Sequence, residues 1–179
     1  MTKTAVSPQY AGVSEPGRPP DAGLDAFNAV YEREFDYVWR TAARFGVPPG
    51  DLADAAHEVF LVLYRKWHDL ERKDELRPWL FGVARRVAAG FRAKRREELV
   101  TVDAAVPVDP LAAKRELLYR AMDSLDEDRR AVIILHDLEG RTGAEIAALL
   151  DIPANTVHSR LRLARADLLE AVRKLGGTR

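Results

Sequence analysis

The chain has 179 residues, 47% of them hydrophobic, which is enough for one ordinary domain or two small helical ones. It contains no cysteine, which excludes a disulfide framework, a thiolate zinc site and a cysteine nucleophile. Its 28 basic and 28 acidic residues give a net charge of zero, which taken as a whole disfavours a nucleic-acid-binding protein.

The charges are nevertheless unevenly distributed along the chain. Residues 85–96 hold six basic residues and no acidic one, whereas residues 21–36 hold five acidic residues and a single basic one. A protein that separates its charges in this way can present opposite faces to different partners.

The N-terminal residues 1–23 lack the apolar segment of a signal peptide, and their prolines and glycines predict a disordered tail. No apolar run of the chain approaches the length of a membrane span, so we expect no membrane insertion. The absence of cysteine fits a reducing, cytoplasmic location.

The first half predicts three amphipathic helices, because apolar residues recur every three or four positions over residues 24–45, 51–67 and 78–91. Gly46 and the prolines that follow it end the first helix. Asp51 is expected to cap the second, and Pro78 suits the first turn of the third, which ends in a basic run. These helices predict a domain over residues 24–97.

Residues 98–110 have no helical periodicity, and we predict that they form a flexible linker. Four further helices are expected over residues 111–124, 126–138, 143–150 and 153–176. They form a second domain, residues 111–176, with an aliphatic core. Because long β-branched runs and hairpin signals are absent, the predicted fold is all-α with two small helical domains.

Residues 142–165 have the pattern of a helix-turn-helix, in which a short helix and a tight turn precede a longer helix with polar residues at its start. A helical hairpin with a solvated polar face would show the same spacing. Three arginines without an intervening acid favour DNA binding. The candidate DNA-binding residues are Asn155, Thr156, His158, Ser159, Arg160, Arg162 and Arg165.

The third predicted helix mixes aromatic and basic residues, which suits single-stranded DNA because bases stack on rings and phosphates pair with guanidinium groups. The candidates are Arg77, Trp79, Phe81, Arg85, Arg86 and Arg92. Core packing is the alternative explanation for Trp79. Phe81 lies off the main apolar stripe, so we predict that its ring is exposed.

The second predicted helix carries Asp51, Asp54 and Glu58 on one side, with Phe60 and Leu63 nearby. Such a surface could dock on a helix of a partner protein. Favourable interaction with the helix dipole is an alternative explanation for Asp51 and Asp54.

The sequence predicts no catalytic residue, no metal site and no cofactor. The four histidines are scattered among the predicted elements, and His57-Glu58 is not followed by a second histidine one turn later. No phosphate-binding loop or dinucleotide-type glycine pattern is present.

Three segments resemble the sigma-70 family of transcription initiation factors. Residues 51–61 (DLADAAHEVFL) resemble the D-x-E-D-L-x-Q-E-V-F-L segment of region 2, and residues 77–86 (RPWLFGVARR) its R-x-W-L-x-x-I-A-R-N segment. Residues 142–165 resemble region 4. Length and two-domain organisation resemble the extracytoplasmic-function group, which lacks regions 1 and 3.

The resemblance implies a sigma factor that binds core RNA polymerase and directs promoter recognition and melting. The second helix (Asp51, Asp54, Glu58, Phe60) would dock on the polymerase clamp helices. The third helix and the connection before it would hold the melted strand of a −10-type element. The last helix would read a −35-type element, and the linker, with Asp103 and Asp109, would thread toward the RNA-exit path. We also expect an anti-sigma factor as a partner.

Several positions depart from the family pattern. His57 replaces a usual glutamine, Val87 and Gly90 replace an asparagine and an aspartate, and Asn155 and Leu163 replace a glycine and an arginine; Asp126 stands for a usual proline. Asp151 replaces a turn glycine, where a positive φ is expected.

Three other functions are compatible with parts of the pattern. A stand-alone helix-turn-helix regulator would not need the region-2-like half. A sigma-like decoy that binds only an anti-sigma protein would not need the basic runs. An enzyme would need a site that the sequence does not display.

Overall fold

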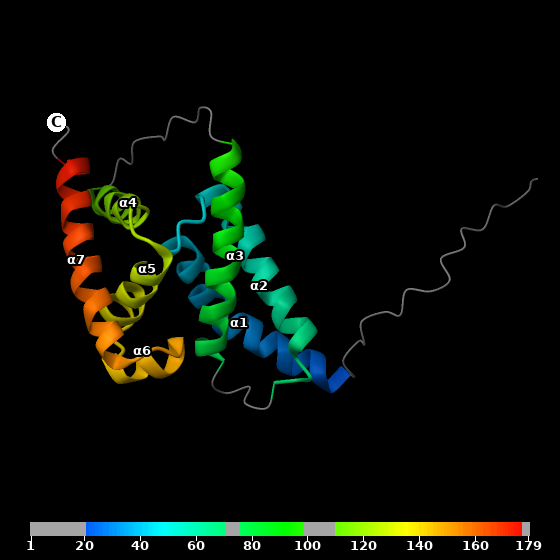
Figure 1. Cartoon of the computed structure of the whole chain (residues 1–179). Helices are drawn as coiled ribbons and strands as arrows, with labels where there is room; N and C mark the ends of the chain where they lie inside the picture. The colour runs from blue at the N-terminus through cyan, green and yellow to red at the C-terminus, as the bar shows by residue number, and fades with distance from the viewer. Residues whose placement is uncertain (1–20, 71–75, 99–109, 177–179) are drawn as a thin grey trace, which may run out of the picture.

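The computed structural model describes residues 21–70, 76–98 and 110–176, and within these ranges it is all-α, as predicted (Figure 1). The elements are α1 (Asp21–Arg44), a 3₁₀ turn η1 (Pro49–Asp51), α2 (Leu52–Lys66), α3 (Arg77–Glu98), α4 (Pro110–Met122), α5 (Glu127–Ile133), a π-helical turn η2 (Ile134–Leu138), α6 (Gly143–Leu150) and α7 (Ala154–Gly176). Among the described helices, none combines the length and hydropathy needed to cross a bilayer.

Two sequence predictions concern residues at or beyond the edges of these ranges. Helix α1 begins at Asp21, so the predicted tail over residues 1–23 overlaps the start of a helix, and residues 1–20 lie outside the description. Most of the predicted linker, with Asp103 and Asp109, also lies outside it, as do residues 71–75 before α3.

The first half is a bundle in which α1, α2 and α3 all contact one another. Aromatic rings fill the space between α1 and α2: Phe27 packs edge-on against Tyr64 and Trp67, and the rings of Tyr31 and Phe60 are 4.5 Å apart. Burial of such large side chains provides most of the favourable free energy of this half. Gly46, with φ +85°, ends α1 and turns the chain toward α2.

The second half is organised around α7, which contacts α4, α5 and α6. The Asp126 side chain caps α5 by accepting a hydrogen bond from the Arg129 backbone N–H at 2.8 Å. Thr142 and Glu145 form a capping box at the start of α6. Asp151 between α6 and α7 has φ 52°, which confirms the positive φ predicted from the sequence. The helix predicted over residues 126–138 is continuous, with α5 passing directly into the wider π-helical turn η2 at its C-terminal end.

The two halves dock on each other, although the sequence predicted only a flexible connection between them. In Figure 1, α1–α3 stand on one side and α4–α7 on the other, with α5 between α7 and the first half. Helix α1 contacts α4, and buried apolar side chains from both halves belong to one continuous cluster. The docking therefore brings the predicted DNA-binding helix α3 against the second half.

Candidate polymerase and nucleic-acid interfaces

The outer face of α2 carries the predicted polymerase-docking acids. Asp54 and Glu58 are exposed, and Leu61, which is 54% exposed, follows them on the same side of the helix. Asp51 occupies the N-cap position, but its side chain accepts no capping hydrogen bond. This face is available to a partner because the opposite face of α2 forms the core of the first half.

Phe60 and Leu63 do not belong to this face, which corrects the prediction that they lie beside the acids. Phe60 is 3% exposed and packs on Tyr31, and Leu63 is fully buried. The sequence analysis missed Leu61, although its spacing of three residues from Glu58 places it on the acidic side. Leu61 is the large apolar side chain that α2 offers to a partner.

The aromatic residues of α3 are arranged differently from the prediction. Phe81 is fully buried and lies 5.4 Å from the Phe45 ring, so the prediction of an exposed ring was wrong. It is buried because the end of α1 covers this side of α3, a tertiary contact that the apolar stripe does not reveal. Trp79 is half-buried instead, and it is the α3 candidate ring with a part open to solvent.

Arg77, at the start of α3, is paired within the first half. Its guanidinium donates a 2.8 Å hydrogen bond to buried Glu34 and lies 5.1 Å from the centre of the Tyr37 ring. Burial alone would raise the pKa of Glu34, but hydrogen bonds from Arg77 and Arg33 outweigh it and hold the pKa below its usual value. Arg77 therefore has a structural partner as well as an exposed position.

Two further α3 arginines pair with the acidic first turn of α5. Arg85 donates to Glu127 at 2.7 Å and to Asp128 at 2.6 Å, and Arg92 donates to Glu127 at 3.3 Å. Arg86 is exposed and bonds to the Gly82 carbonyl of its own helix. The predicted strand-binding face of α3 is thus partly covered by the second half.

The helix-turn-helix has the arrangement that the sequence predicted. Val157 and Leu161 of α7 are buried against α6, while Ala147, Leu150 and Ile152 are partly buried; Ile146, which the sequence analysis did not name, is the fully buried member of α6. The outward residues of α7 are Asn155, His158, Ser159, Arg162 and Arg165, with Thr156 and Arg160 half-buried.

Two arginines of α7 also have acidic partners. Arg160 lies 2.6 Å from Asp128, and Arg165 pairs with Asp137. The pKa of Asp137 is lowered by the Arg165 hydrogen bonds, despite partial burial. No described acidic side chain pairs with Arg162, which makes it the predicted DNA-binding arginine of α7 that is open to a ligand in this conformation.

Comparison with known proteins identifies the family. Residues 30–98 match the family model for sigma-70 region 2, and residues 115–168 match that for sigma-70 region 4. The ECF RNA polymerase sigma-E factor of Escherichia coli (strain K12) is 30% identical over 169 residues, which cover 84% of this chain and 88% of that protein. The chain belongs to the extracytoplasmic-function group of sigma factors.

Other relatives agree with this assignment. The RNA polymerase sigma factor NccH of Alcaligenes xylosoxydans xylosoxydans is 27% identical over 157 residues, 80% of this sigma factor and 84% of NccH. Two solved structures share the fold. One is the sigma factor RpoE of Bartonella quintana in complex with the anti-sigma factor NepR (TM-score 0.65, 21% identity, 82% and 96% of the two chains covered). The other is CnrH in complex with the cytosolic domain of CnrY (TM-score 0.63, 22%, 85% and 95%).

The junction between the two halves of this sigma factor is anchored by Arg130 of α5. Its side chain is 1% exposed, donates a 2.7 Å hydrogen bond to the Phe45 carbonyl and lies 3.1 Å from Asp123. Burial and the neighbouring Arg92 guanidinium lower the pKa of Arg130 to about 10, so it remains charged at neutral pH. A charged donor thus satisfies a carbonyl at the end of α1.

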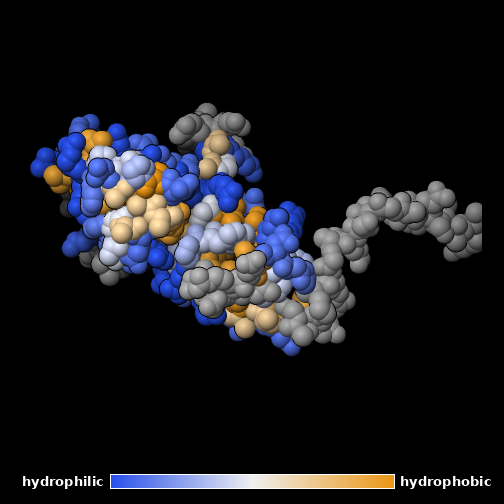
Figure 2. Space-filling view, turned by 60° about the horizontal axis from the view of Figure 1, so that its bottom comes forward, coloured by the Kyte–Doolittle hydropathy of each residue, from blue (hydrophilic) through white to orange (hydrophobic). Residues whose placement is uncertain are grey.

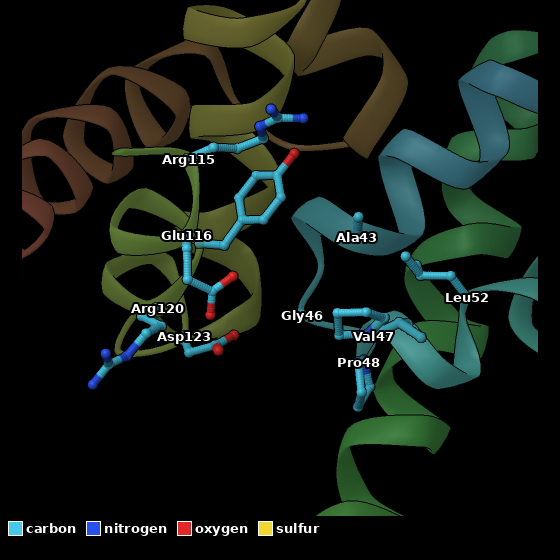
Figure 3. Close-up of a pocket in the computed structure, with 11 residues that line it drawn as sticks. Ala43, Gly46, Val47, Pro48, Leu52, Arg115, Glu116, Arg120 and Asp123 are labelled. Atoms are coloured by element: carbon cyan, nitrogen blue, oxygen red, sulfur yellow. The ribbon is translucent and has the colours of Figure 1, made fainter. Parts of the chain in front are cut away.

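The junction is not fully closed. A groove of about 320 Å³ runs between the segment after α1 and helix α4 (Figure 3). In Figure 3, Gly46, Val47 and Pro48 face Glu116 and Asp123 across it. On the face drawn in Figure 2, hydrophilic residues surround several groups of hydrophobic residues.

Proposed function

We propose that this sigma factor binds core RNA polymerase through the outer face of α2 and recognises promoter DNA through α3 and α7. The observation that carries the proposal is the presence, in one chain, of an exposed acidic helix face and a helix-turn-helix with an exposed polar face. A regulator that binds DNA alone would use only the second of these.

On α2, Asp54, Glu58 and Leu61 would contact the clamp helices of the polymerase, with the carboxylates steering association and the leucine providing apolar contact area. Asp51 lies at the edge of this face. Phe60 would act indirectly, by fixing α2 against α1.

On α3, Arg85, Arg86 and Arg92 would bind phosphates of the melted −10-type strand, and Trp79 would stack on a base. Arg77 would add a phosphate contact near the start of the helix. Phe81 would support the helix from the core without touching DNA.

On α7, Asn155, His158 and Ser159 point outward at the start of the helix, where the recognition helix of a helix-turn-helix reads base edges. Thr156, Arg160, Arg162 and Arg165 would contact phosphates or bases of the −35-type element. We further propose an anti-sigma factor as a partner, since both structurally similar sigma factors were solved in complexes, one of them named as an anti-sigma complex. The protein would act in the cytoplasm.

The first test is run-off transcription from a genomic promoter library with core polymerase, with and without this protein. We expect new start sites that share two upstream elements. Binding to core without new starts would indicate a decoy, and DNA binding without core binding would indicate a stand-alone regulator.

The second test separates the two surfaces. Asp54→Ala with Glu58→Ala should weaken core binding and leave binding of isolated −35-type DNA unchanged. Arg160→Ala and Arg162→Ala should each weaken DNA binding by about 1–3 kcal/mol, or roughly 5- to 150-fold, while core binding is retained. Asp36→Ala and Arg173→Ala, at exposed positions elsewhere on α1 and α7, are the matched controls. If all four substitutions left both activities intact, the site assignment would be wrong.

A further inference from the structure

We propose that the acidic first turn of α5 imitates DNA phosphates and holds the free sigma factor in a closed form that must open before promoter DNA binds. The proposal rests on the proposed function, because it assumes that α3 and α7 carry the DNA-binding arginines. It adds an internal competitor for those arginines.

Asp128 is central to this arrangement because it joins both DNA-binding helices. One carboxylate oxygen accepts a hydrogen bond from Arg85 of α3 at 2.6 Å, and the other lies 2.6 Å from Arg160 of α7. Glu127 is shared in the same way, between Arg85 and Arg92 of α3. Two carboxylates thus occupy three arginines that belong to the proposed DNA contacts.

Carboxylates and phosphates compete for the same positions on an arginine. The guanidinium group presents a planar fork of N–H donors that fits either anion, and bonding distances of 2.6–2.7 Å leave no room for a phosphate oxygen at the same donors. DNA can therefore bind Arg85 and Arg160 only after Asp128 has moved away. Because Glu127 and Asp128 lie in the second half and Arg85 and Arg92 in the first, separation of the halves frees these two α3 arginines. The Asp128–Arg160 pair lies within the second half, so DNA has to displace the Asp128 carboxylate there.

The backbone at the junction is built for this close approach. Gly46 has φ +85°, a conformation that favours glycine, and a Cβ atom there would lie 2.4 Å from the Asp123 carboxylate and 2.8 Å from the Arg130 guanidinium, so a larger residue would also displace these side chains. Arg130 then reaches the Phe45 carbonyl from within the interface. The two halves thus meet through defined contacts between the end of α1 and the Arg130 side chain.

The same junction contains features that make it easy to open. The guanidinium groups of half-buried Arg92 and buried Arg130 repel each other, and the buried Nε atom of each has no hydrogen-bond partner among the described residues. The ion pairs of Glu127 and Asp128 are partly exposed to solvent and hence screened by salt. The open groove leaves part of the junction without packing contacts, which favours relative motion of the two halves.

The test compares two charge-matched variants of the full chain. E127Q/D128N removes the two interface carboxylates, whereas D151N/E170Q removes two exposed carboxylates that pair with no described residue of α1–α3. Because the chain has no cysteine, N28C and A166C introduce unique sites for a donor and an acceptor dye on exposed positions of α1 and α7. Energy transfer reports the separation of the halves, and a mixed-sequence duplex with a single-stranded extension is the DNA probe.

We expect the unsubstituted protein and D151N/E170Q to show mainly the short dye separation, and added DNA to lengthen it. E127Q/D128N should show the long separation without DNA and should bind the probe at least about fivefold more tightly than D151N/E170Q at equal salt. Unchanged separation in E127Q/D128N, or equal DNA affinity of the two variants, would overturn the proposal. Failure of the proposed function itself would appear separately, as the absence of new starts in the run-off assay.

Discussion

At the residue scale, Asp151 shows what a single backbone conformation requires of the chain. It adopts φ 52° and ψ 52° between α6 and α7, a left-handed conformation that costs most L-residues about 1–2 kcal/mol. We expect Asp151→Gly to raise the free energy of unfolding by about 0.5–1 kcal/mol, and Asp151→Val to lower it. Urea denaturation of the three proteins measures both changes. An Asp151→Gly protein no more stable than the parent would contradict the expected backbone strain.

Glu34 provides a second residue-scale prediction, which depends on pH. Its pKa is held below the usual value, so its ionised form is favoured in the folded protein. The resulting stabilisation is present above the unfolded-state pKa and is lost as the pH falls through the lower, folded-state pKa. We expect Glu34→Gln to lower the free energy of unfolding by about 1–2 kcal/mol near neutral pH, and by less in acid. Urea denaturation at several pH values tests this; a difference independent of pH would exclude the ionic contribution.

Single residues also show why part of the site could not be predicted from the sequence. The outward residues of α7 followed from helical periodicity and the turn, because both are local. Phe81 and Phe60 could not be placed, since the elements that cover them lie far away in the chain. Leu61 was predictable, because its spacing of three residues from Glu58 places it on the acidic side of α2.

At the element scale, the start of α6 was predicted to the residue because its determinants are local. The Thr142 hydroxyl accepts a hydrogen bond from the Glu145 N–H, and the Glu145 carboxylate accepts one from the Thr142 N–H at 2.7 Å. The widening of this helix into the π-helical turn η2 was not predictable, because the apolar pattern of residues 126–138 fits an α-helix throughout. The sequence period does not distinguish an α-helix from one π-helical turn.

The capping box gives the element-scale prediction. Thr142→Ala should lower the free energy of unfolding by about 0.5–2 kcal/mol. Thr142→Ser should lower it much less, because the hydroxyl acceptor is kept. The pKa of Glu145 is lowered by its backbone and side-chain hydrogen bonds to Thr142, so its contribution disappears as the pH falls through that pKa. Thermal unfolding at neutral and acidic pH measures both effects. Equal losses for the alanine and serine variants would rule out the hydroxyl cap.

At the scale of the whole molecule, the existence of two helical halves followed from composition and periodicity, but their docking did not. The ion pairs across the junction join residues 42 and 43 positions apart, and the Tyr37–Glu139 contact spans 102 positions. A periodic pattern carries no information about such distant partners.

Glu139 provides a whole-molecule prediction about how closure depends on pH. Its carboxylate faces Tyr37 and Arg44 of α1, Arg141 of its own half and, at longer range, Arg77 of α3. Burial raises the pKa of Glu139, and the arginines do not fully offset it. A raised pKa means that the closed form binds the proton more tightly than the open form. The resulting stabilisation of closure is fully present below the open-form pKa and is lost as the pH rises through the higher, closed-form pKa.

Removing this charge should therefore close the molecule further, in contrast to E127Q/D128N, which should open it. Glu139→Gln keeps an acceptor for the Tyr37 hydroxyl and avoids the cost of burying an ionised carboxylate, as is common for incompletely compensated buried pairs. With dyes at N28C and A166C, we expect E139Q to show a larger closed fraction than the parent at about pH 7 and a smaller difference at about pH 5. The comparison with the parent and with E170Q isolates the contribution of Glu139. A more open E139Q protein would contradict this prediction. It would show that the ion pairs of Glu139 with Arg44 and Arg141 stabilise the closed form by more than burial of the carboxylate costs.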